Sequence, residues 1–163
     1  MTSRAVPFRL VLLCTGNTCR SPLAAAAFRE ELGADAERVE VLSAGTAASD
    51  GQPASVGASE AAARAGLDLT AHRSRRPDAG LLSDADLVLV MEHEHARAAE
   101  ALGADPRRIH VLSEWPDPGE PALAVSDPFG GSLEAYEECL GRIRRHVRRI
   151  VPRVREALRS RPA

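Results

Sequence analysis

The hydrophobic positions of this chain form short apolar runs separated by longer segments of helical periodicity. Such runs are typical of strands buried on both faces of a sheet. They lie at Phe8 to Leu13, Val39 to Leu42, Asp86 to Met91 and Ile109 to Leu112. Helices are predicted from Leu23 to Leu32, with Pro22 in the first turn, from Ser55 to Ala65 and from Glu92 to Leu102. This alternation predicts an α/β fold whose parallel sheet is covered by helices.

The last predicted element is a long amphipathic helix that begins near Ser132. Its apolar residues recur every three or four positions. They are Leu133, Tyr136, Leu140, Ile143, Val147, Ile150, Val154 and Leu158. Pro152 should kink or weaken the last turns. The stretch before this helix, residues 113–131, contains Pro116, Pro118, Pro121 and Pro128 and is predicted to be a long loop, a feature that is often functional in a compact domain.

Composition narrows the classes of protein that fit. With 163 residues, 44% hydrophobic and 27% charged, the chain is expected to form one domain over residues 1–163. A net charge of -2 gives no overall attraction to nucleic acid or to an anionic membrane, so any anion site must be local. The N-terminus lacks the pattern of a signal peptide, no apolar run approaches a membrane span, and three irregularly spaced cysteines suit a reducing compartment. We therefore expect a soluble cytoplasmic protein.

The segment from Cys14 to Pro22 joins the first strand to the first helix and carries the strongest chemical signal. A loop between a strand and a helix can turn backbone N–H groups inward, and together with the helix N-terminus it forms an anion cradle. Gly16 permits unusual backbone angles, and Asn17 tolerates the left-handed region. The segment is therefore predicted to bind phosphate.

Arg20 and the neighbouring thiol complete this motif. Arg20 follows Cys14 by six residues and can offer two parallel N–H donors to phosphate oxygens. A cysteine beside a cation at a helix N-terminus is usually a thiolate at neutral pH, so we expect Cys14 to be a nucleophile. Ser21 could donate a hydrogen bond to the sulfur or cap the helix, and the sequence leaves both roles open.

Cys14, five intervening residues, Arg20 and Ser21 at the end of the first strand resemble the signature of the low-molecular-weight protein tyrosine phosphatases. The resemblance extends over nearly the whole chain. It includes residues 43–46 (Ser-Ala-Gly-Thr), His72, the strand at residues 86–91, and residues 127–130 (Asp-Pro-Phe-Gly). We expect a four-stranded parallel sheet in the order 2-1-3-4 with helices on both faces.

The resemblance also implies the roles of the site residues. Cys14 is expected to take the phosphoryl group, Arg20 to hold it, and Asp127 to protonate the leaving group before water releases phosphate. A proton donor opposite the thiolate is also what displacement at phosphorus requires, and Asp127 lies in the long proline-rich loop. The remaining residues expected to contact substrate or phosphate are Thr15, Gly16, Asn17, Thr18, Cys19, Ser21 and Phe129. No metal or other cofactor is expected.

The loop residues also bear on the substrate, which is expected to be a phosphorylated protein. Family members that prefer phosphotyrosine usually carry isoleucine at the place of Thr18 and further aromatic residues around the ring slot. This chain has a polar Thr18, and Gly130 follows Phe129. These features resemble the protein-arginine phosphatase branch of the family, so phosphoarginine is the predicted substrate and phosphotyrosine the alternative.

Other interpretations of the same residues remain open. An arsenate reductase would need two further cysteines, of which the chain has only Cys139. A silent phosphate-binding module would lack Cys14 or Asp127, and a nucleic-acid binder would use the arginines of the last helix. Cys19 either packs under the loop or, as the resemblance favours, forms a reversible disulfide with Cys14.

The histidines give weaker signals than the loop. His72 is expected to be structural. His93 and His95 lie two residues apart on a predicted helix, so they should face different directions and be exposed to solvent.

Overall fold

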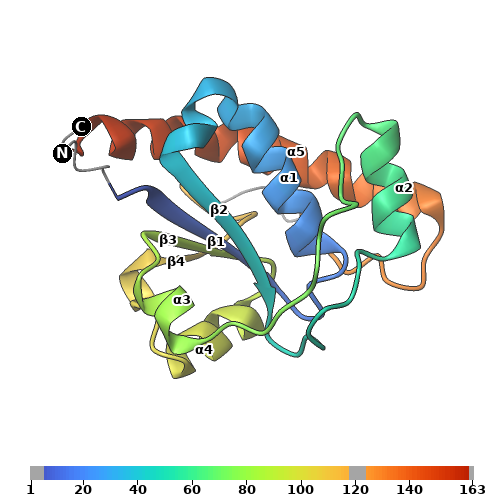
Figure 1. Ribbon diagram of the computed structural model, residues 1–163, viewed down its shortest axis with the longest axis horizontal. Helices are drawn as coiled ribbons and strands as arrows, with labels where there is room; N and C mark the ends of the chain where they lie inside the picture. Colours follow the sequence, from blue (N-terminus) through green and yellow to red (C-terminus); the bar gives the residue numbers. More distant parts are fainter. Residues whose placement is uncertain (1–5, 118–123, 162–163) are drawn as a thin grey trace.

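The computed structural model describes residues 6–117 and 124–161, and its sheet confirms the predicted fold class. The strands are β1 (Phe8–Cys14), β2 (Val39–Gly45), β3 (Leu87–Val90) and β4 (Ile109–Val111). They are all parallel and lie in the order β2-β1-β3-β4 (Figure 1). Because β1 is central and buried on both faces, the four residues Leu10 to Leu13 are inaccessible to solvent.

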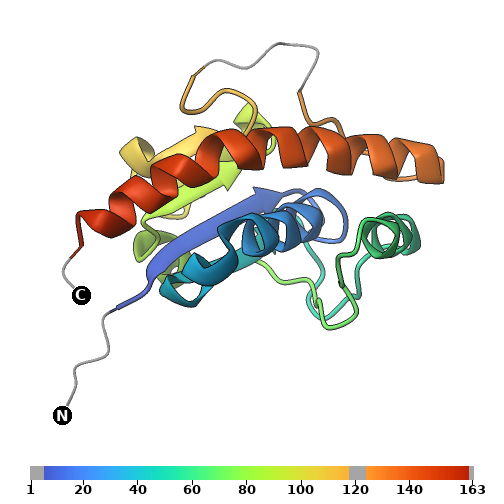
Figure 2. The ribbon, with the colours of Figure 1, turned by 90° about the horizontal axis from the view of Figure 1, so that it is seen from above.

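Helices cover both faces of this sheet, as expected. The helices are α1 (Arg20–Leu32), α2 (Val56–Arg64), α3 (Ala79–Ser83), α4 (His93–Ala101) and α5 (Leu133–Arg159). Figures 1 and 2 show α1 and α5 on one face, α3 and α4 on the other, and α2 beside the N-terminal half of α5. Two short 3-10 helices, η1 (Gly33–Arg38) and η2 (Pro106–Arg108), lead into β2 and β4. None of the helices in the described ranges has the length and apolarity to cross a membrane.

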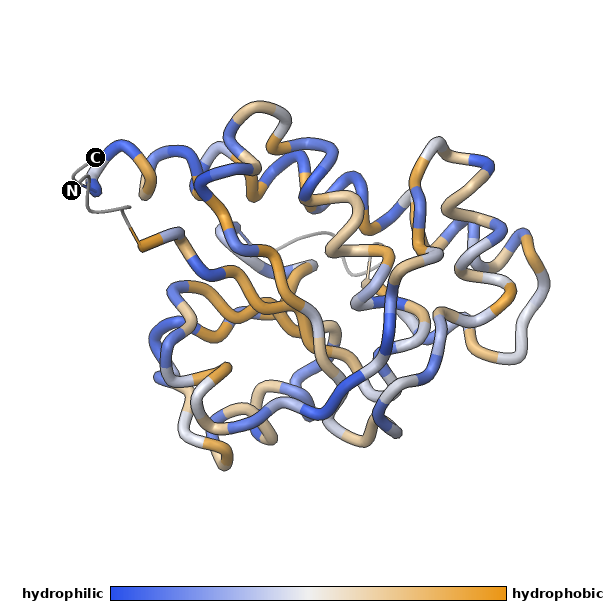
Figure 3. The backbone as a smooth tube through the Cα atoms, in the orientation of Figure 1, coloured by the Kyte–Doolittle hydropathy of each residue, from blue (hydrophilic) through white to orange (hydrophobic). Residues whose placement is uncertain are grey.

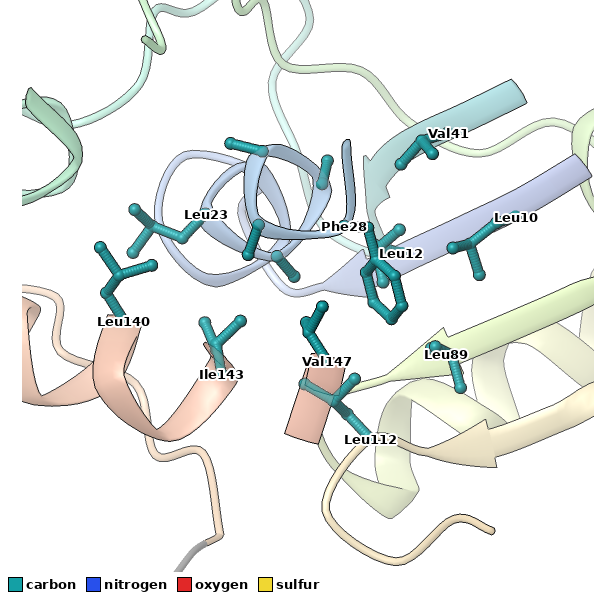
Figure 4. Close-up of a cluster of buried hydrophobic side chains, with 14 of the residues drawn as sticks. Leu10, Leu12, Leu23, Phe28, Val41, Leu89, Leu112, Leu140, Ile143 and Val147 are labelled. Atoms are coloured by element: carbon teal, nitrogen blue, oxygen red, sulfur yellow. The ribbon is translucent and has the colours of Figure 1, made fainter. Parts of the chain in front are cut away.

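Alternate residues of the strands enter two separate hydrophobic clusters. Leu10 and Leu12 of β1 face α1 and α5, where Leu23, Phe28 and Ile143 complete the larger cluster (Figure 4). Residues of the opposite parity, such as Val11 and Leu13, pack against α3 and α4. The apolar centre is visible as the orange strands of Figure 3. Burial on both faces therefore fixes the register of β1 and the place where it ends.

Several boundaries differ from those predicted. Helix α1 begins at Arg20 rather than Leu23, and β2 continues to Gly45 rather than ending at Leu42. Helix α3 was not predicted, because five residues give too short a periodic signal. Helix α5 begins after Ser132, whose side chain accepts from the N–H of Ala135, and it continues through Pro152 to Arg159. Of the predicted long loop, Pro118 and Pro121 lie outside the described residues.

Candidate active site

The loop that follows β1 is shaped by a left-handed residue and by a close backbone contact. Asn17 is the residue with positive φ (56°), whereas Gly16 does not adopt such an angle, contrary to its predicted role. Gly45, at the end of β2, lies directly beneath the loop. A Cβ atom there would come within 2.6 Å of the Thr15 carbonyl oxygen and 2.8 Å of the Asn17 nitrogen. Glycine at position 45 therefore lets the loop lie against β2.

Asn17 also connects the loop to its surroundings. Its amide nitrogen donates to Ser21 Oγ (2.8 Å) and Ser43 Oγ (3.0 Å), and its amide oxygen accepts from the Arg75 N–H (3.0 Å). His72 Nε2 lies 2.6 Å from the Asn17 carbonyl oxygen. Burial lowers the pKa of His72, so the neutral ring donates to this carbonyl. Asn17 is fully buried and braces the loop from beneath.

Cys14 Sγ lies at the base of the loop with two hydrogen-bond neighbours. The backbone N–H of Asn17 donates to it at 3.3 Å, and Ser21 Oγ lies 2.9 Å away. Ser21 Oγ accepts from the Asn17 side-chain amide, and its own proton can go to the nearer sulfur or to the Ala44 carbonyl oxygen, which lies 3.5 Å away. The N-cap of α1 is Cys19, and Ser21 lies in the first turn of that helix. Of the two roles left open for Ser21, the contacts thus favour a hydrogen bond to the Cys14 sulfur.

Arg20 is almost fully buried, and one of its terminal nitrogens is held by the protein. Nη1 donates to Glu92 Oε1 at 2.8 Å and to the carbonyl oxygen of Val125 at 3.1 Å. The Nε–H and Nη2 groups are not used in these hydrogen bonds. This pair of groups can donate two parallel hydrogen bonds to a phosphate. Burial alone would raise the pKa of Glu92, but the hydrogen bond and charge of Arg20 lower it overall. Glu92 and Val125 were not recognised from the sequence, because neither forms a local motif with Cys14.

Asp127 faces this arginine from the loop before α5. Its Oδ2 lies 3.8 Å from Arg20 Nη2, and its Oδ1 accepts from the N–H of Phe129 at 3.0 Å. Its side chain is about half exposed to solvent. A cavity of about 220 Å³ opens between this loop and the β1–α1 loop. It is lined by Cys14, Thr15, Gly16, Thr18, Cys19, Arg20, Asp127 and Phe129.

The structure thus brings together the predicted site residues from two distant segments. Two of them, Asn17 and Ser21, lie buried behind the cavity rather than on its wall. Within the described ranges, no carbonyl accepts the backbone N–H groups of Gly16, Thr18 and Cys19. Unpaired N–H groups in a curled loop at the start of a helix are the donors of an anion cradle.

His95 contradicts the prediction that it is exposed. Only 1% of its surface is accessible, and its Nε2 lies 2.9 Å from Thr15 Oγ1 in the loop. Its Nδ1 accepts from the N–H of Glu92 at 3.1 Å, which closes a capping box at the start of α4. His93 is exposed, as expected, and its Nε2 lies 2.9 Å from Glu114 Oε1. The helical spacing separated the two rings correctly, but it gave no information about which one faces the loop.

The two other cysteines have separate environments. Cys19 Sγ lies 3.2 Å from Ser55 Oγ and 3.9 Å from the Tyr136 hydroxyl, and no disulfide is present. Gly57 admits the Tyr136 ring, because a Cβ at that position would overlap it. Cys139 packs in the core along α5, and burial raises its pKa to about 12. A disulfide between Cys14 and Cys19 stays a prediction.

One group of described residues has the side-chain types that bind metals. Glu92, Glu94 and His95 place their ligand atoms within 4.8 Å of one another. Glu92 Oε1 already accepts from Arg20, and His95 Nε2 is engaged with Thr15. These atoms are therefore already engaged in hydrogen bonds that hold the loop and Arg20, and we assign no metal site to this group.

Comparisons with known proteins agree with this geometry. A family model described as "Low molecular weight phosphotyrosine protein phosphatase" matches residues 9–160. The chain is 36% identical to a probable low molecular weight protein-tyrosine-phosphatase, EpsP, of Ralstonia nicotianae, over 90% of this chain and 95% of that protein. It is 32% identical to a protein-arginine-phosphatase of Bacillus subtilis, over 90% and 97%. The solved YwlE arginine phosphatase from Geobacillus stearothermophilus is 30% identical, with a TM-score of 0.82 over 96% of this chain and 99% of that one.

Proposed function

Because this chain belongs to the low molecular weight phosphotyrosine protein phosphatase family, we propose that it removes phosphoryl groups from protein side chains with Cys14 as nucleophile, and that phosphoarginine is its preferred substrate. The family consists of cysteine-dependent protein phosphatases, and tyrosine and arginine phosphatases are both among its relatives. The observation that carries the reaction class is the Cys14 sulfur at the base of a cavity shared with Arg20 and Asp127.

The contacts support a two-step mechanism. The thiolate attacks phosphorus, and a P–S bond forms as the P–N bond of phosphoarginine, or the P–O bond of phosphotyrosine, breaks. Asp127 gives its proton to the departing nitrogen or oxygen. Water then attacks the phosphocysteine, Asp127 takes a proton from that water, and the sulfur leaves as a thiolate that can accept the Ser21 hydrogen bond. Arg20 and the loop N–H groups hold the equatorial oxygens throughout.

The cavity wall supports phosphoarginine as the preferred substrate. Phe129 is the only aromatic residue among its described lining residues, and 73% of the Phe129 surface is exposed. The hydroxyl-bearing Thr18 also lines the cavity. A phosphorylated guanidino group is polar and planar, so a partly polar slot with one ring suits it better than a phenyl ring, which needs apolar contact on both faces.

The decisive experiment compares turnover of phosphoarginine and phosphotyrosine in peptides of matched sequence. We expect a higher kcat/KM for phosphoarginine and no turnover by Cys14→Ser. Asp127→Asn should reduce kcat on the wild-type's better substrate by about 100-fold or more, because a positioned acid contributes about 10²–10⁴-fold. A higher kcat/KM for phosphotyrosine would overturn the substrate assignment alone, whereas full activity of Cys14→Ser would overturn the mechanism.

A further inference from the structure

A buried histidine controls the direction of a hydroxyl group in the loop between β1 and α1, which we call the phosphate loop. His95 Nδ1 accepts from the backbone N–H of Glu92, so the neutral ring must carry its proton on Nε2. Burial and the positive charge of Arg20 lower the pKa of His95, and together they outweigh two nearby carboxylates that raise it, so the ring is neutral near pH 7. Nε2–H therefore donates to Thr15 Oγ1, 2.9 Å away.

The hydrogen bond from His95 determines where the Thr15 hydroxyl can donate its own proton. A hydroxyl has one proton and two lone pairs, and the contact with His95 uses a lone pair. Among the described residues, no other side chain or carbonyl takes the Thr15 proton. Thr15 lines the cavity beside Cys14 and Arg20. The proton is thus free for an acceptor in the cavity.

From these contacts we propose that the Thr15 hydroxyl donates a hydrogen bond to a phosphoryl oxygen, and that His95 is the positioning residue that keeps this hydroxyl a donor. The inference rests on the proposed function, since it requires a phosphoryl group in the loop. It adds a side-chain donor to a cradle otherwise made of backbone N–H groups and Arg20.

His95 is well placed for such a role because it is held by the same residue that holds Arg20. Glu92 receives Nη1 of Arg20 through its side chain and offers its backbone N–H to the His95 ring. Glu94 Oε1 also lies 3.8 Å from Nε2, but it is mostly exposed to solvent. Glu92, the N-cap of α4, therefore aligns two phosphate donors, the guanidinium directly and the hydroxyl through the imidazole.

Two pairs of variants test the proposal, with inorganic phosphate as the probe and its affinity measured by calorimetry. Thr15→Val removes the hydroxyl at nearly constant size, and Thr15→Ser keeps it. His95→Asn keeps an acceptor for the Glu92 N–H but is too short to reach Thr15, whereas His95→Gln extends an N–H donor toward Thr15. We expect Thr15→Val and His95→Asn to bind phosphate about 10-fold or more weakly, as for loss of a hydrogen bond to a charged group. Thr15→Ser and His95→Gln should remain within about 3-fold of the wild type.

The double variant separates positioning from a general structural effect. If His95 acts through Thr15, Thr15→Val with His95→Asn should bind phosphate no more weakly than Thr15→Val alone. If the two losses of phosphate affinity instead multiply in the double variant, the positioning role of His95 is overturned. Unchanged phosphate affinity of Thr15→Val would overturn the donor, and this result can be read even if His95→Asn fails to fold.

The rate at which iodoacetamide alkylates Cys14 shows whether the Thr15 hydroxyl donates to the phosphoryl group or to the Cys14 sulfur. Equal rates for Thr15→Val and wild type are expected, because the hydroxyl serves the phosphoryl group. A slower rate in the variant would place the hydrogen bond on the sulfur and overturn the proposal. Because calorimetry needs no turnover, a wild type that binds phosphate but hydrolyses no phosphorylated peptide would disprove the proposed function and leave this inference standing.

Discussion

Thr18 lines the cavity, and its side chain is expected to bear on the choice of substrate. It lies between Asn17, which braces the loop, and Cys19, which contacts Ser55 and Tyr136. Its backbone carbonyl accepts from the N–H of Ser55 at 2.9 Å, so its position is held by the start of α2. The backbone is therefore fixed, and a change of side chain alters mainly the shape and polarity of the cavity.

Thr18→Ile should shift the preference from phosphoarginine toward phosphotyrosine. Isoleucine replaces the hydroxyl with a larger apolar surface that packs against a phenyl ring. We expect the ratio of the two kcat/KM values to change by about 10-fold or more, the range of small changes in an apolar pocket. Thr18→Val is the matched control, because it replaces the hydroxyl with a methyl group and keeps the number of side-chain heavy atoms unchanged. Unchanged relative efficiencies in both variants would remove Thr18 as the selector.

At the level of elements, the end of β2 supports the loop that follows β1. The two strands pair in register from Phe8 with Val39 to Cys14 with Gly45, and the N–H of Thr46 then donates to the Cys14 carbonyl at 2.9 Å. The contact continues beyond the sheet, since Ala47 donates to the Thr15 carbonyl at 2.9 Å. The shape of the phosphate loop therefore depends on the neighbouring strand as well as on its own sequence.

Gly45→Ala should distort this contact, because the added methyl group would meet three backbone atoms of the loop within 2.9 Å. We expect a loss of about 1–3 kcal/mol in the free energy of unfolding, typical of overpacking, together with a larger loss of phosphate affinity than stability alone would predict. Denaturant unfolding and calorimetry measure the two effects. Gly141→Ala in α5 is the control, because its methyl group meets no atom within 4 Å and alanine favours the helix. Equal stability of the two variants would contradict the prediction.

Across the whole molecule, three histidines of the described residues tie stability to pH, namely the buried His95 and the partly buried His72 and His110. Burial lowers the pKa of His72, His95 and His110 below the ordinary value of 6.5. Two of them contact the phosphate loop, and His110 stacks on Trp115 with ring centroids 4.9 Å apart. Each ring binds a proton more readily in the unfolded chain than in the folded one. Their stabilisation is therefore complete above about pH 6.5 and is lost as the pH falls through the folded-state values.

The free energy of unfolding should consequently be lower at pH 5.5 than at pH 7.5, with uptake of protons on unfolding. Denaturant titrations at both values measure the difference, and few carboxylates with ordinary pKa values titrate in this window. His110→Gln, which lies away from the phosphate loop, should reduce the dependence on pH without abolishing it. A free energy of unfolding that is equal at the two pH values would disprove that these histidines make stability depend on pH.

Features of the fold that arise from neighbouring residues were predictable from the sequence, whereas those that arise from long-range contacts were not. The buried strands, the long amphipathic helix and the loop from Cys14 to Arg20 were predictable, because periodicity and motif spacing are written in contiguous residues. The proline-rich loop and the family resemblance predict Asp127 as the candidate acid, and the structure places its Oδ2 3.8 Å from Arg20 Nη2. Helix α3 gave too short a pattern to be recognised.

The sequence by itself determined the order of elements and the residues of the phosphate loop, since these follow from side-chain periodicity and from groups that are neighbours along the chain. Only the tertiary structure decided that Glu92 holds Arg20, that His95 reaches Thr15 and that Gly45 must lack a side chain. The physical reason is that parallel strands bring their carboxyl ends to one edge of the sheet, so residues far apart in sequence meet there at distances that no local pattern encodes.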